Sequence, residues 1–308
     1  MKEMIKNRRR FIKQGVAAMA ALSTGLPAVA GNKRPDGYSG PIGLQLYTLG
    51  DAVQQDPARV FAQLVAIGYR EVEALTYANL TPAALRRHAA NAGLLMRSAH
   101  LDFATATDLS RLFDIAHQLG VTQVVSSVLP PVPQDFGSFI AGTGSLTIDD
   151  FRRIAERAQR IGELAYRAGL NYAYHNHNFE FRNLGSGVLG YDVLLRDTDP
   201  RYVRFELDCG WMSFAGVDPV GYLKRHGHRF HALHIKNFDM IGYSTSIDAT
   251  SQDHITELGR GVIDYRPILA TALQRDVRSL FIEHDPSRGV PIPMDMVGRE
   301  FEYLESII

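Results

Sequence analysis

The stretch from Val203 to Lys236 reads VRFELDCGWMSFAGVDPVGYLKRHGHRFHALHIK and contains one complete unit of the fold. It begins with a short run rich in β-branched and aromatic residues, Val203–Asp208, and it ends with a second such run, Phe230–Lys236. Between them, Pro219–His226 starts with a proline and has the composition of a short helix. Two strands joined through a helix predict a parallel β–α–β unit.

The same alternation extends from Pro41 to the end of the chain. Further strands are expected at Ile42–Tyr47, Glu71–Ala74, Leu94–Ala99, Gln123–Ser126, Asn171–His175 and Ser279–Glu283. Further helices are expected at Pro57–Ile67, Pro82–Ala92, Leu109–Leu119, Ile148–Ala168, Tyr191–Arg196, Tyr265–Gln274 and Met296–Ile307. No Gly-x-Gly-x-x-Gly opens the first helix, which removes the usual signal of a dinucleotide fold. Strict alternation over this length predicts a (β/α)8 TIM barrel.

Two connections are longer than the others and come after the fourth and seventh expected strands. They comprise residues 127–146 and 237–264. Both leave the carboxyl ends of strands, where the active sites of such barrels lie. We expect them to be lids or substrate walls.

Four side chains that bind hard cations stand at the ends of successive strand-like runs: Glu180, Asp208, His234 and Glu283. The first two gaps are 28 (208 − 180) and 26 (234 − 208) residues, about one strand plus one helix. Strand ends converge on one face of a parallel barrel, so ligands at this spacing can meet around one ion. Oxygen ligands with one imidazole suit Mn²⁺, Mg²⁺, Co²⁺ or Zn²⁺. The pattern indicates a metal-assisted enzyme.

The first thirty residues have the order of an export signal. Asn7-Arg8-Arg9-Arg10-Phe11-Ile12-Lys13 has the form of a twin-arginine motif, an apolar stretch comes next at 15–26, and Ala28-Val29-Ala30 offers a cleavage site. We therefore expect a signal peptide at 1–30, a short linker at 31–40 and a catalytic barrel at 41–308. The signal predicts passage through the twin-arginine export machinery to the periplasm, with no stable membrane anchoring afterwards.

Charge and cysteine content narrow the function further. The chain has 33 basic and 33 acidic residues. Residues 1–30 hold six of the basic residues and one of the acidic residues, so cleavage would leave 27 basic and 32 acidic residues, a net charge of −5. This balance gives no electrostatic footprint for nucleic acid. The single cysteine, Cys209, excludes a disulfide within the chain and is expected to be a small buried hydrophobe.

Short motifs along the chain carry a family resemblance: IGLQLYTL, GYREVE, RSAH, YHNHNFEF, ELDCGW, HALHIKN, ELGRGVIDY and FIEHD. With them, residues 41–308 resemble the sugar isomerase/epimerase superfamily of xylose isomerase-like TIM barrels. The resemblance implies one divalent metal held by Glu, Asp, His and Glu from strands 5 to 8, and two glutamates that flank the substrate as acid and base. These residues correspond here to Glu180, Asp208, His234 and Glu283.

Strand 5 departs from the pattern of the ketose 3-epimerases in this family, which have a glutamate within the strand. Here the strand carries His175 and His177, and Glu180 comes at its end. Either Glu180 or His175 is therefore expected as the strand-5 ligand, and the departure raises the expectation of elimination chemistry.

Other side chains near the strand ends are expected to bind the substrate: His100, His175, His177, Trp211 and Lys236. Lys236 can hold a developing oxyanion, although a lysine at a strand end is also an ordinary surface residue. Trp211, the only tryptophan, can stack on a sugar ring or pack under the barrel mouth.

The expected substrate is a small-molecule carbohydrate. A metal that binds a sugar carbonyl and the neighbouring hydroxyl acidifies the C–H between them, and a carboxylate can then take the proton. We expect an isomerase or epimerase that acts through an enediolate. The alternative is a lyase or dehydratase that acts on a keto sugar or a 3-keto glycoside with the same residues.

Two other function classes are less favoured. An endonuclease-IV-like phosphodiesterase has the same fold, but it binds DNA and gathers three metals, which the acidic mature charge and the export signal disfavour. A non-catalytic sugar-binding protein would not need both Glu180 and Glu283. A homo-oligomer is left open, because nothing in the sequence decides it.

Overall fold

The computed structural model describes residues 38, 40–242, 244–247, 249–275, 277–286 and 292–308. The expected export signal at 1–30 lies outside the described residues, as does the linker at 31–40 except for Tyr38 and Gly40. Both stay predictions. Within the described ranges, no helix combines the length and the apolar character that crossing a bilayer requires.

Parallel strands close into an eight-stranded barrel, which confirms the predicted (β/α)8 architecture. Each strand pairs with its neighbour along the chain, and β1 pairs with both β2 and β10, so the sheet has no free edge. The strands are β1 (Ile42–Gln45), β2 (Glu71–Ala74), β3 (Leu95–His100), β4 (Gln123–Ser126), β5 (Asn171–His175), β6 (Val203–Asp208), β7 (Phe230–Ile235) and β10 (Ser279–Ile282).

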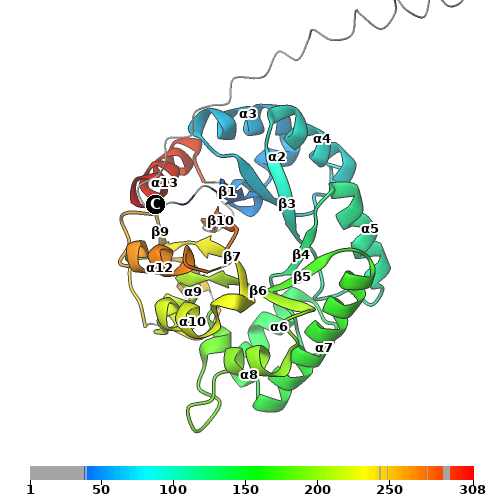
Figure 1. Cartoon of the computed structure of the whole chain (residues 1–308), viewed down its shortest axis with the longest axis vertical. Helices are drawn as coiled ribbons and strands as arrows, with labels where there is room; N and C mark the ends of the chain where they lie inside the picture. Colours follow the sequence, from blue (N-terminus) through cyan, green and yellow to red (C-terminus); the bar gives the residue numbers. More distant parts are fainter. Residues whose placement is uncertain (1–37, 39, 243, 248, 276, 287–291) are drawn as a thin grey trace, which may run out of the picture. The chain divides into compact units, whose positions relative to one another are not determined.

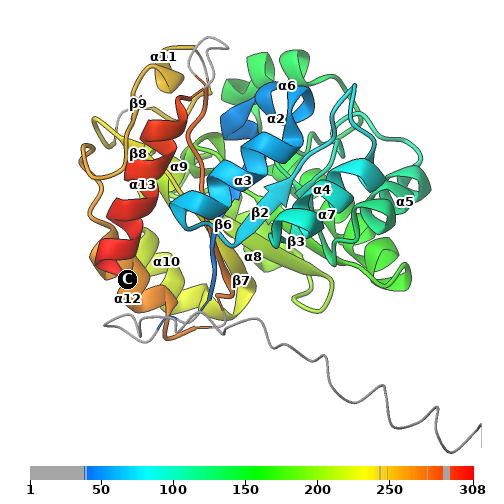
Figure 2. The ribbon, with the colours of Figure 1, turned by 90° about the horizontal axis from the view of Figure 1, so that it is seen from above.

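Helices surround the barrel, as Figures 1 and 2 show from two directions. The main ones are α3 (Pro57–Ile67), α4 (Pro82–Ala92), α5 (Leu109–Leu119), α7 (Ile148–Arg167), α8 (Gly190–Asp197), α10 (Pro219–His226), α12 (Tyr265–Ala272) and α13 (Met294–Ile307). Shorter ones are α2 (Ala52–Gln55), α6 (Phe136–Gly142), α9 (Cys209–Phe214) and α11 (Ala249–Gln252). Single 3-10 turns are η1 (Leu46–Leu49), η2 (Thr143–Ser145), η3 (Phe179–Phe181) and η4 (Gly227–Arg229).

Local signals explain why the main helices begin and end where they do. Thr81 caps α4 by accepting a hydrogen bond from the Ala84 amide, and Pro82 occupies the first turn. At the other end Gly93 takes a left-handed conformation with φ of 79°. The longest helix, α7, starts with a reciprocal capping box between Thr147 and Asp150.

Several other strands and helices begin or end one or two residues from the expected positions, and three regions differ in a way that bears on the site. The first strand ends at Gln45, two residues early, because the Gln45 side chain accepts from the Tyr47 amide and starts η1. The connection at 127–146 contains α6 and η2. The connection at 237–264 contains α11 and a two-stranded sheet of β8 (Asn237–Phe238) and β9 (Ile255–Thr256).

Phe281, on β10, lies inside the barrel and has neighbours toward both of its ends. An added Cβ at Gly43 of β1 would lie 2.5 Å from a ring carbon of Phe281, so the glycine leaves room for this ring. On the carboxyl side of the strands, the ring centroid of Phe281 lies 5.9 Å from that of His234. On the amino side the same ring lines a cavity. The two ends of the barrel interior are therefore separate places for ligands.

Candidate active site at the carboxyl ends of the strands

Four side chains from four neighbouring strands meet at the carboxyl end of the barrel and form the upper group: His175, Asp208, His234 and Glu283. His175 and Asp208 are the last residues of β5 and β6, His234 is the penultimate residue of β7, and Glu283 comes directly after β10. One ligand-type atom of each lies within 4.8 Å of the others. This geometry is compatible with a bound metal ion.

A second group lies beside it and is called the deep group: His100, His175, Glu206 and His234. Its ligand-type atoms also lie within 4.8 Å of one another. Glu206 Oε2 is the centre, at 2.8 Å from His100 Nε2, 3.1 Å from His175 Nδ1 and 3.1 Å from His234 Nε2. Glu73 of β2 adds a carboxylate oxygen 2.7 Å from His234 Nε2.

The two imidazoles shared by both groups have one nitrogen on each side. His234 directs Nδ1 to Glu283 Oε2 at 2.9 Å, while its Nε2 contacts the two deep carboxylates. His175 directs Nε2 toward Asp208 Oδ2 at 3.9 Å, while its Nδ1 contacts Glu206. When deep carboxylates accept the N–H of each ring, the upper nitrogens present lone pairs, which is the usual support of histidines that bind metals.

Asp208 has two oxygens in different situations. Its Oδ1 accepts a 2.7 Å hydrogen bond from the Trp211 amide and so caps α9. Its Oδ2 is buried, accepts no hydrogen bond from any residue that the structure describes, and lies 3.5 Å from Lys236 Nζ in an ion pair. Gly210 permits this close turn, because a Cβ there would lie 2.6 Å from the Lys236 carbonyl oxygen. A buried carboxylate oxygen without a donor is what a cation would satisfy.

Charge around Glu283 favours its ionised form. Burial alone would raise the pKa of the Glu283 carboxyl, but the Lys236 ammonium and the His234 ring hold that pKa well below its ordinary value. Lys236 Nζ lies 2.9 Å from Glu283 Oε2 and 3.0 Å from Asp285 Oδ1. Burial raises the pKa of Asp285 to about 6, although Lys236 opposes this shift. A carboxylate base and an ammonium group therefore lie side by side.

Besides Glu206 Oε1 of the deep group, two more buried polar atoms in this region have no hydrogen-bond partner within the described part of the chain, His177 Nδ1 and Trp211 Nε1. Their ring centroids are 5.9 Å apart, and Lys236 Nζ lies 5.1 Å from the Trp211 ring centroid. Burial lowers the pKa of His177 well below its ordinary value, and His175 and Lys236 lower it further. A neutral imidazole and an indole N–H are thus available to the hydroxyls of a ligand.

Glu180 lies apart from both groups. It sits in η3, fully buried, where its carboxylate accepts from the Tyr174 hydroxyl at 2.9 Å and from the His177 amide at 3.0 Å. Burial raises its pKa to about 8. Of the two candidates for the strand-5 ligand, the structure places His175 in the upper group and holds Glu180 by hydrogen bonds behind the strand end.

The remaining expected residues lie around the same end. His100 belongs to the deep group, where it contacts Glu206 and Glu73, and it is not part of the upper group. Sequence reasoning missed Glu206 and Asp285, although each obeys a simple rule. Residues two apart on a strand face the same way, so Glu206 shares a face with Asp208; Asp285 comes after Glu283 at the same interval.

The comparisons with known proteins agree with this fold. The sequence model of a family described as "Xylose isomerase-like TIM barrel" matches residues 61–307. An inosose dehydratase of Geobacillus thermodenitrificans is 25% identical over 168 residues, which is 50% of this chain and 54% of that protein. The chain thus spans about half the length of the curated relatives that it matches.

Solved structures share the fold over most of this chain. A sugar phosphate isomerase/epimerase of Parabacteroides distasonis has a TM-score of 0.69 at 23% identity, over 92% of this chain and 97% of that protein. A xylose isomerase-like TIM barrel protein of Mycobacterium smegmatis, in complex with magnesium, has a TM-score of 0.57 at 17% identity, over 87% and 96%. These identities establish the fold alone.

Proposed function

Because the chain belongs to the xylose isomerase-like TIM-barrel family, we propose that it is a divalent-metal enzyme that removes a proton beside the carbonyl of a keto sugar. The similar proteins include dehydratases and an isomerase/epimerase by name, so the family alone does not choose between the two reactions. We favour elimination, in which the carbanion expels a β-oxygen substituent. A 3-keto glycoside is a suitable substrate class, because its glycosidic oxygen is β to the ketone.

The upper group supplies the residues that would hold the ion, His175, Asp208, His234 and Glu283. Asp208 Oδ2 supports this fit, since it is buried without a hydrogen-bond donor among the described residues. Nitrogen and oxygen donors without a thiolate suit Mn²⁺, Mg²⁺, Co²⁺ or Zn²⁺. When bound, such an ion would polarise the carbonyl of the substrate and stabilise negative charge on its oxygen.

One observation carries the preference for elimination. Of the two glutamates expected to flank the substrate, only Glu283 reaches the group, while Glu180 is held by Tyr174 and His177. Epimerisation by two carboxylates needs one on each side of the reacting carbon. Elimination needs one base and one proton donor for the leaving oxygen.

The chain's own residues can perform each part of the elimination. Glu283 takes the proton from the carbon next to the ketone, and the electron pair forms a double bond to the β-carbon as the C–O bond there breaks. The leaving oxygen takes up a proton. Lys236 is held as an ammonium by Asp285 and Glu283, with Nζ 2.9 Å from Glu283 Oε2, and it can give up this proton once Glu283 has been neutralised by the proton it takes. His177 and Trp211 orient the sugar hydroxyls.

Epimerisation is the second candidate, and His177 favours it. Its buried Nδ1 has no partner among the described residues, so a neutral His177 can exchange a proton with the substrate in place of Glu180. Glu283 would then act on one face of the carbon and His177 on the other. The two reactions share the removal of the first proton and differ in the second step.

A metal-loaded screen in deuterated water separates them. Keto sugars and 3-keto glycosides are incubated with the protein, and products are monitored by NMR. Elimination predicts an unsaturated keto sugar with release of the substituent. Deuterium in an epimerised sugar without unsaturated product would replace elimination by epimerisation. Loaded protein that neither exchanges the proton nor forms a product with any member of either class would overturn the proposal.

A further inference from the structure

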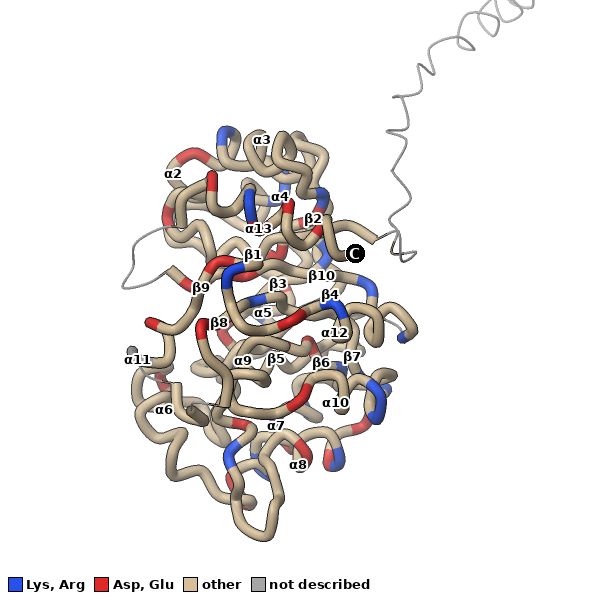
Figure 3. Tube along the Cα trace, turned by 90° about the vertical axis from the view of Figure 1, so that its left-hand side faces the viewer, with Lys and Arg blue, Asp and Glu red and all other residues tan. Residues whose placement is uncertain are grey.

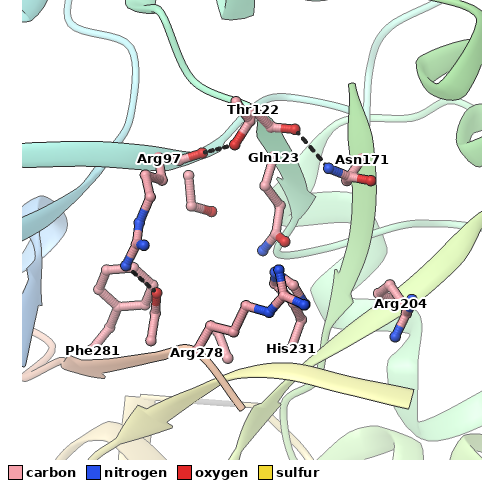
Figure 4. Close-up of a pocket in the computed structure, with 11 residues that line it drawn as sticks. Arg97, Thr122, Gln123, Asn171, Arg204, His231, Arg278 and Phe281 are labelled. Atoms are coloured by element: carbon pink, nitrogen blue, oxygen red, sulfur yellow. Dashed lines mark hydrogen bonds between the residues drawn. The ribbon is translucent and has the colours of Figure 1, made fainter. Parts of the chain in front are cut away.

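A cavity of about 270 Å³ lies at the opposite end of the barrel, where the strands begin. Figure 4 shows it in close-up. None of the residues of the upper or the deep group lines it. Phe281 lines it, and the ring centroid of Phe281 lies 5.9 Å from that of His234. The cavity is therefore distinct from the candidate active site.

Positive charge is the main feature of its wall. Three arginines line the cavity: Arg97 of β3, Arg204 of β6 and Arg278, the residue before β10. Among the lining residues that the structure describes, none is acidic. Figure 3 shows basic residues along this side of the molecule, near β4, β7 and α10. A concave, cation-lined cavity concentrates the field that attracts an anion.

The arginines differ in how their charge is balanced. Arg97 binds Glu71 with two hydrogen bonds of 2.7 and 2.9 Å, which fixes its guanidinium against the barrel wall. Arg204 donates one hydrogen bond, of 2.9 Å, to the carbonyl of His228 and has no carboxylate partner within the described ranges. The Arg204 charge is thus held in place by a neutral group and remains available to an anion.

Gln123 is an independent sign of a ligand. It is the first residue of β4, its exposure is 6%, and its side-chain amide makes no hydrogen bond in the part of the chain that the structure describes. Figure 4 shows this amide directed into the cavity, on the side of the Arg278 guanidinium, with Arg97 across from them. The amide is accessible from the cavity rather than sealed in the core, so it can contact a ligand there.

We infer that this cavity binds a small oxyanion with two or more negative charges, of which inorganic phosphate is the simplest. The planar guanidinium fork matches the oxygens of phosphate and carboxylate, and an amide N–H completes the shell. The volume lies just below the usual range of drug-sized pockets, so the ligand is small. The inference is independent of the proposed reaction, since no residue of the upper group takes part.

Isothermal titration calorimetry on the full-length protein tests it, with inorganic phosphate, pyrophosphate and malonate as probes at constant ionic strength in sodium chloride. Saturable binding at one site is expected for wild type. Arg204→Gln and Gln123→Ala should each weaken it about tenfold or more, because each removes a direct contact to a charged ligand. Arg160→Gln removes the same charge from the exposed face of α7 and should bind as wild type.

The probes also identify the ligand class. Preference for phosphate or pyrophosphate assigns the site to phosphorylated compounds, and preference for malonate assigns it to carboxylates; both support an oxyanion site. Absence of saturable binding for all three probes would overturn the inference, and so would unchanged affinity in both variants. If one variant fails to fold by circular dichroism, Arg278→Gln takes its place under the same criterion.

Discussion

The two ends of the barrel are built from the same strands but have opposite chemistry. Strand β6 shows this on one face, where Arg204 stands at the start, Glu206 in the middle and Asp208 at the end. The carboxyl end has a buried carboxylate oxygen, Asp208 Oδ2, that accepts no hydrogen bond from the described residues, and therefore suits a cation. The amino end has a cavity lined by arginines, with the Gln123 amide directed into it, and therefore suits an anion. Position along a strand decides which ligand its side chains can bind.

The ends are separated in space but joined by hydrogen bonds. Ser98 lines the cavity at the amino ends of the strands, which we call the lower cavity. Its hydroxyl donates to Glu73 Oε1 at 2.5 Å, and Glu73 Oε2 lies 2.7 Å from His234 Nε2. The deep group and Glu73 thus make the middle of the barrel polar, although barrel interiors are usually packed with apolar residues. We attribute this polarity to the need for carboxylates below the histidines of the upper group.

The largest expected effect comes from removing the carboxylate charge of Asp208 at the carboxyl end. Asp208→Asn keeps an oxygen that can cap α9 but removes the charge. We expect metal affinity to fall by about 10² or more, since a ligand should matter at least as much as the groups that orient it. Metal content by mass spectrometry and turnover measure this. The control is Asp218→Asn, which changes the corresponding cap of α10 at an exposed site and should leave both unchanged.

Glu283→Gln tests the base. The amide keeps the shape but cannot take a proton, so turnover should fall by about 10²–10⁴ while sugar binding persists. Metal content is measured in parallel, because Glu283 belongs to the upper group. Metal-loaded Glu283→Gln with wild-type exchange of the substrate proton would assign the base to another residue, and Glu156→Gln on the exposed face of α7 provides the control.

Most of the fold could be predicted from the sequence because the signals are local. Glycine caps, a leading proline and short apolar runs mark each unit, and α3, α4, α5 and α10 have the predicted bounds. Asp208, His234 and Glu283 were found by the same logic, since they end strands. Their meeting in one group is a consequence of the closure of the barrel.

The rest depends on tertiary contacts. Glu180 and His175 both lie near the end of strand 5, and the sequence left both open. The Tyr174 hydroxyl and the His177 amide hold Glu180 away, which no spacing rule reveals. The lower cavity was not predicted either, because its arginines come from strands far apart in the sequence and each has an ordinary surface interpretation.

Glu206→Gln tests whether the deep group orients the histidines of the upper group. The amide keeps an oxygen that can accept from His175 Nδ1 but loses the negative charge, which should weaken metal binding about 10- to 100-fold without removing a ligand. Affinity for Mn²⁺ by electron paramagnetic resonance is the readout, and Glu206→Asp should recover part of it. Equal affinity in Glu206→Gln and wild type would show that the histidines are fixed by packing alone.

Arg204→Gln tests the separation of the two ends. It removes a cation without a carboxylate partner among the described residues from the lower cavity and leaves the upper group intact. We expect metal affinity and turnover within about twofold of wild type, because the hydrogen bond of Arg204 goes to the His228 carbonyl and not to the network of the upper group. A tenfold loss of metal affinity in this variant would mean that the ends form one coupled unit.

Glu180→Gln should have the smallest effect at the site and a distinct effect on stability. The pKa of Glu180 is raised from 4.5 to about 8 in the folded chain, so its contribution is fully present below pH 4.5 and is lost as the pH rises through about 8. The glutamine variant should therefore lose less thermal stability than wild type between pH 5 and 9, with metal content retained. If the melting temperatures of the variant and of wild type changed equally with pH, the raised pKa of Glu180 would be refuted.

Anomalous diffraction from crystals of the Mn²⁺-loaded protein tests the proposed metal site most directly. We expect one strong peak within bonding distance of His175 Nε2, Asp208 Oδ2, His234 Nδ1 and Glu283 Oε2. A peak surrounded instead by His100, Glu206 and the opposite nitrogens of the two shared histidines would contradict this site, as would the absence of any peak at the carboxyl end of the barrel.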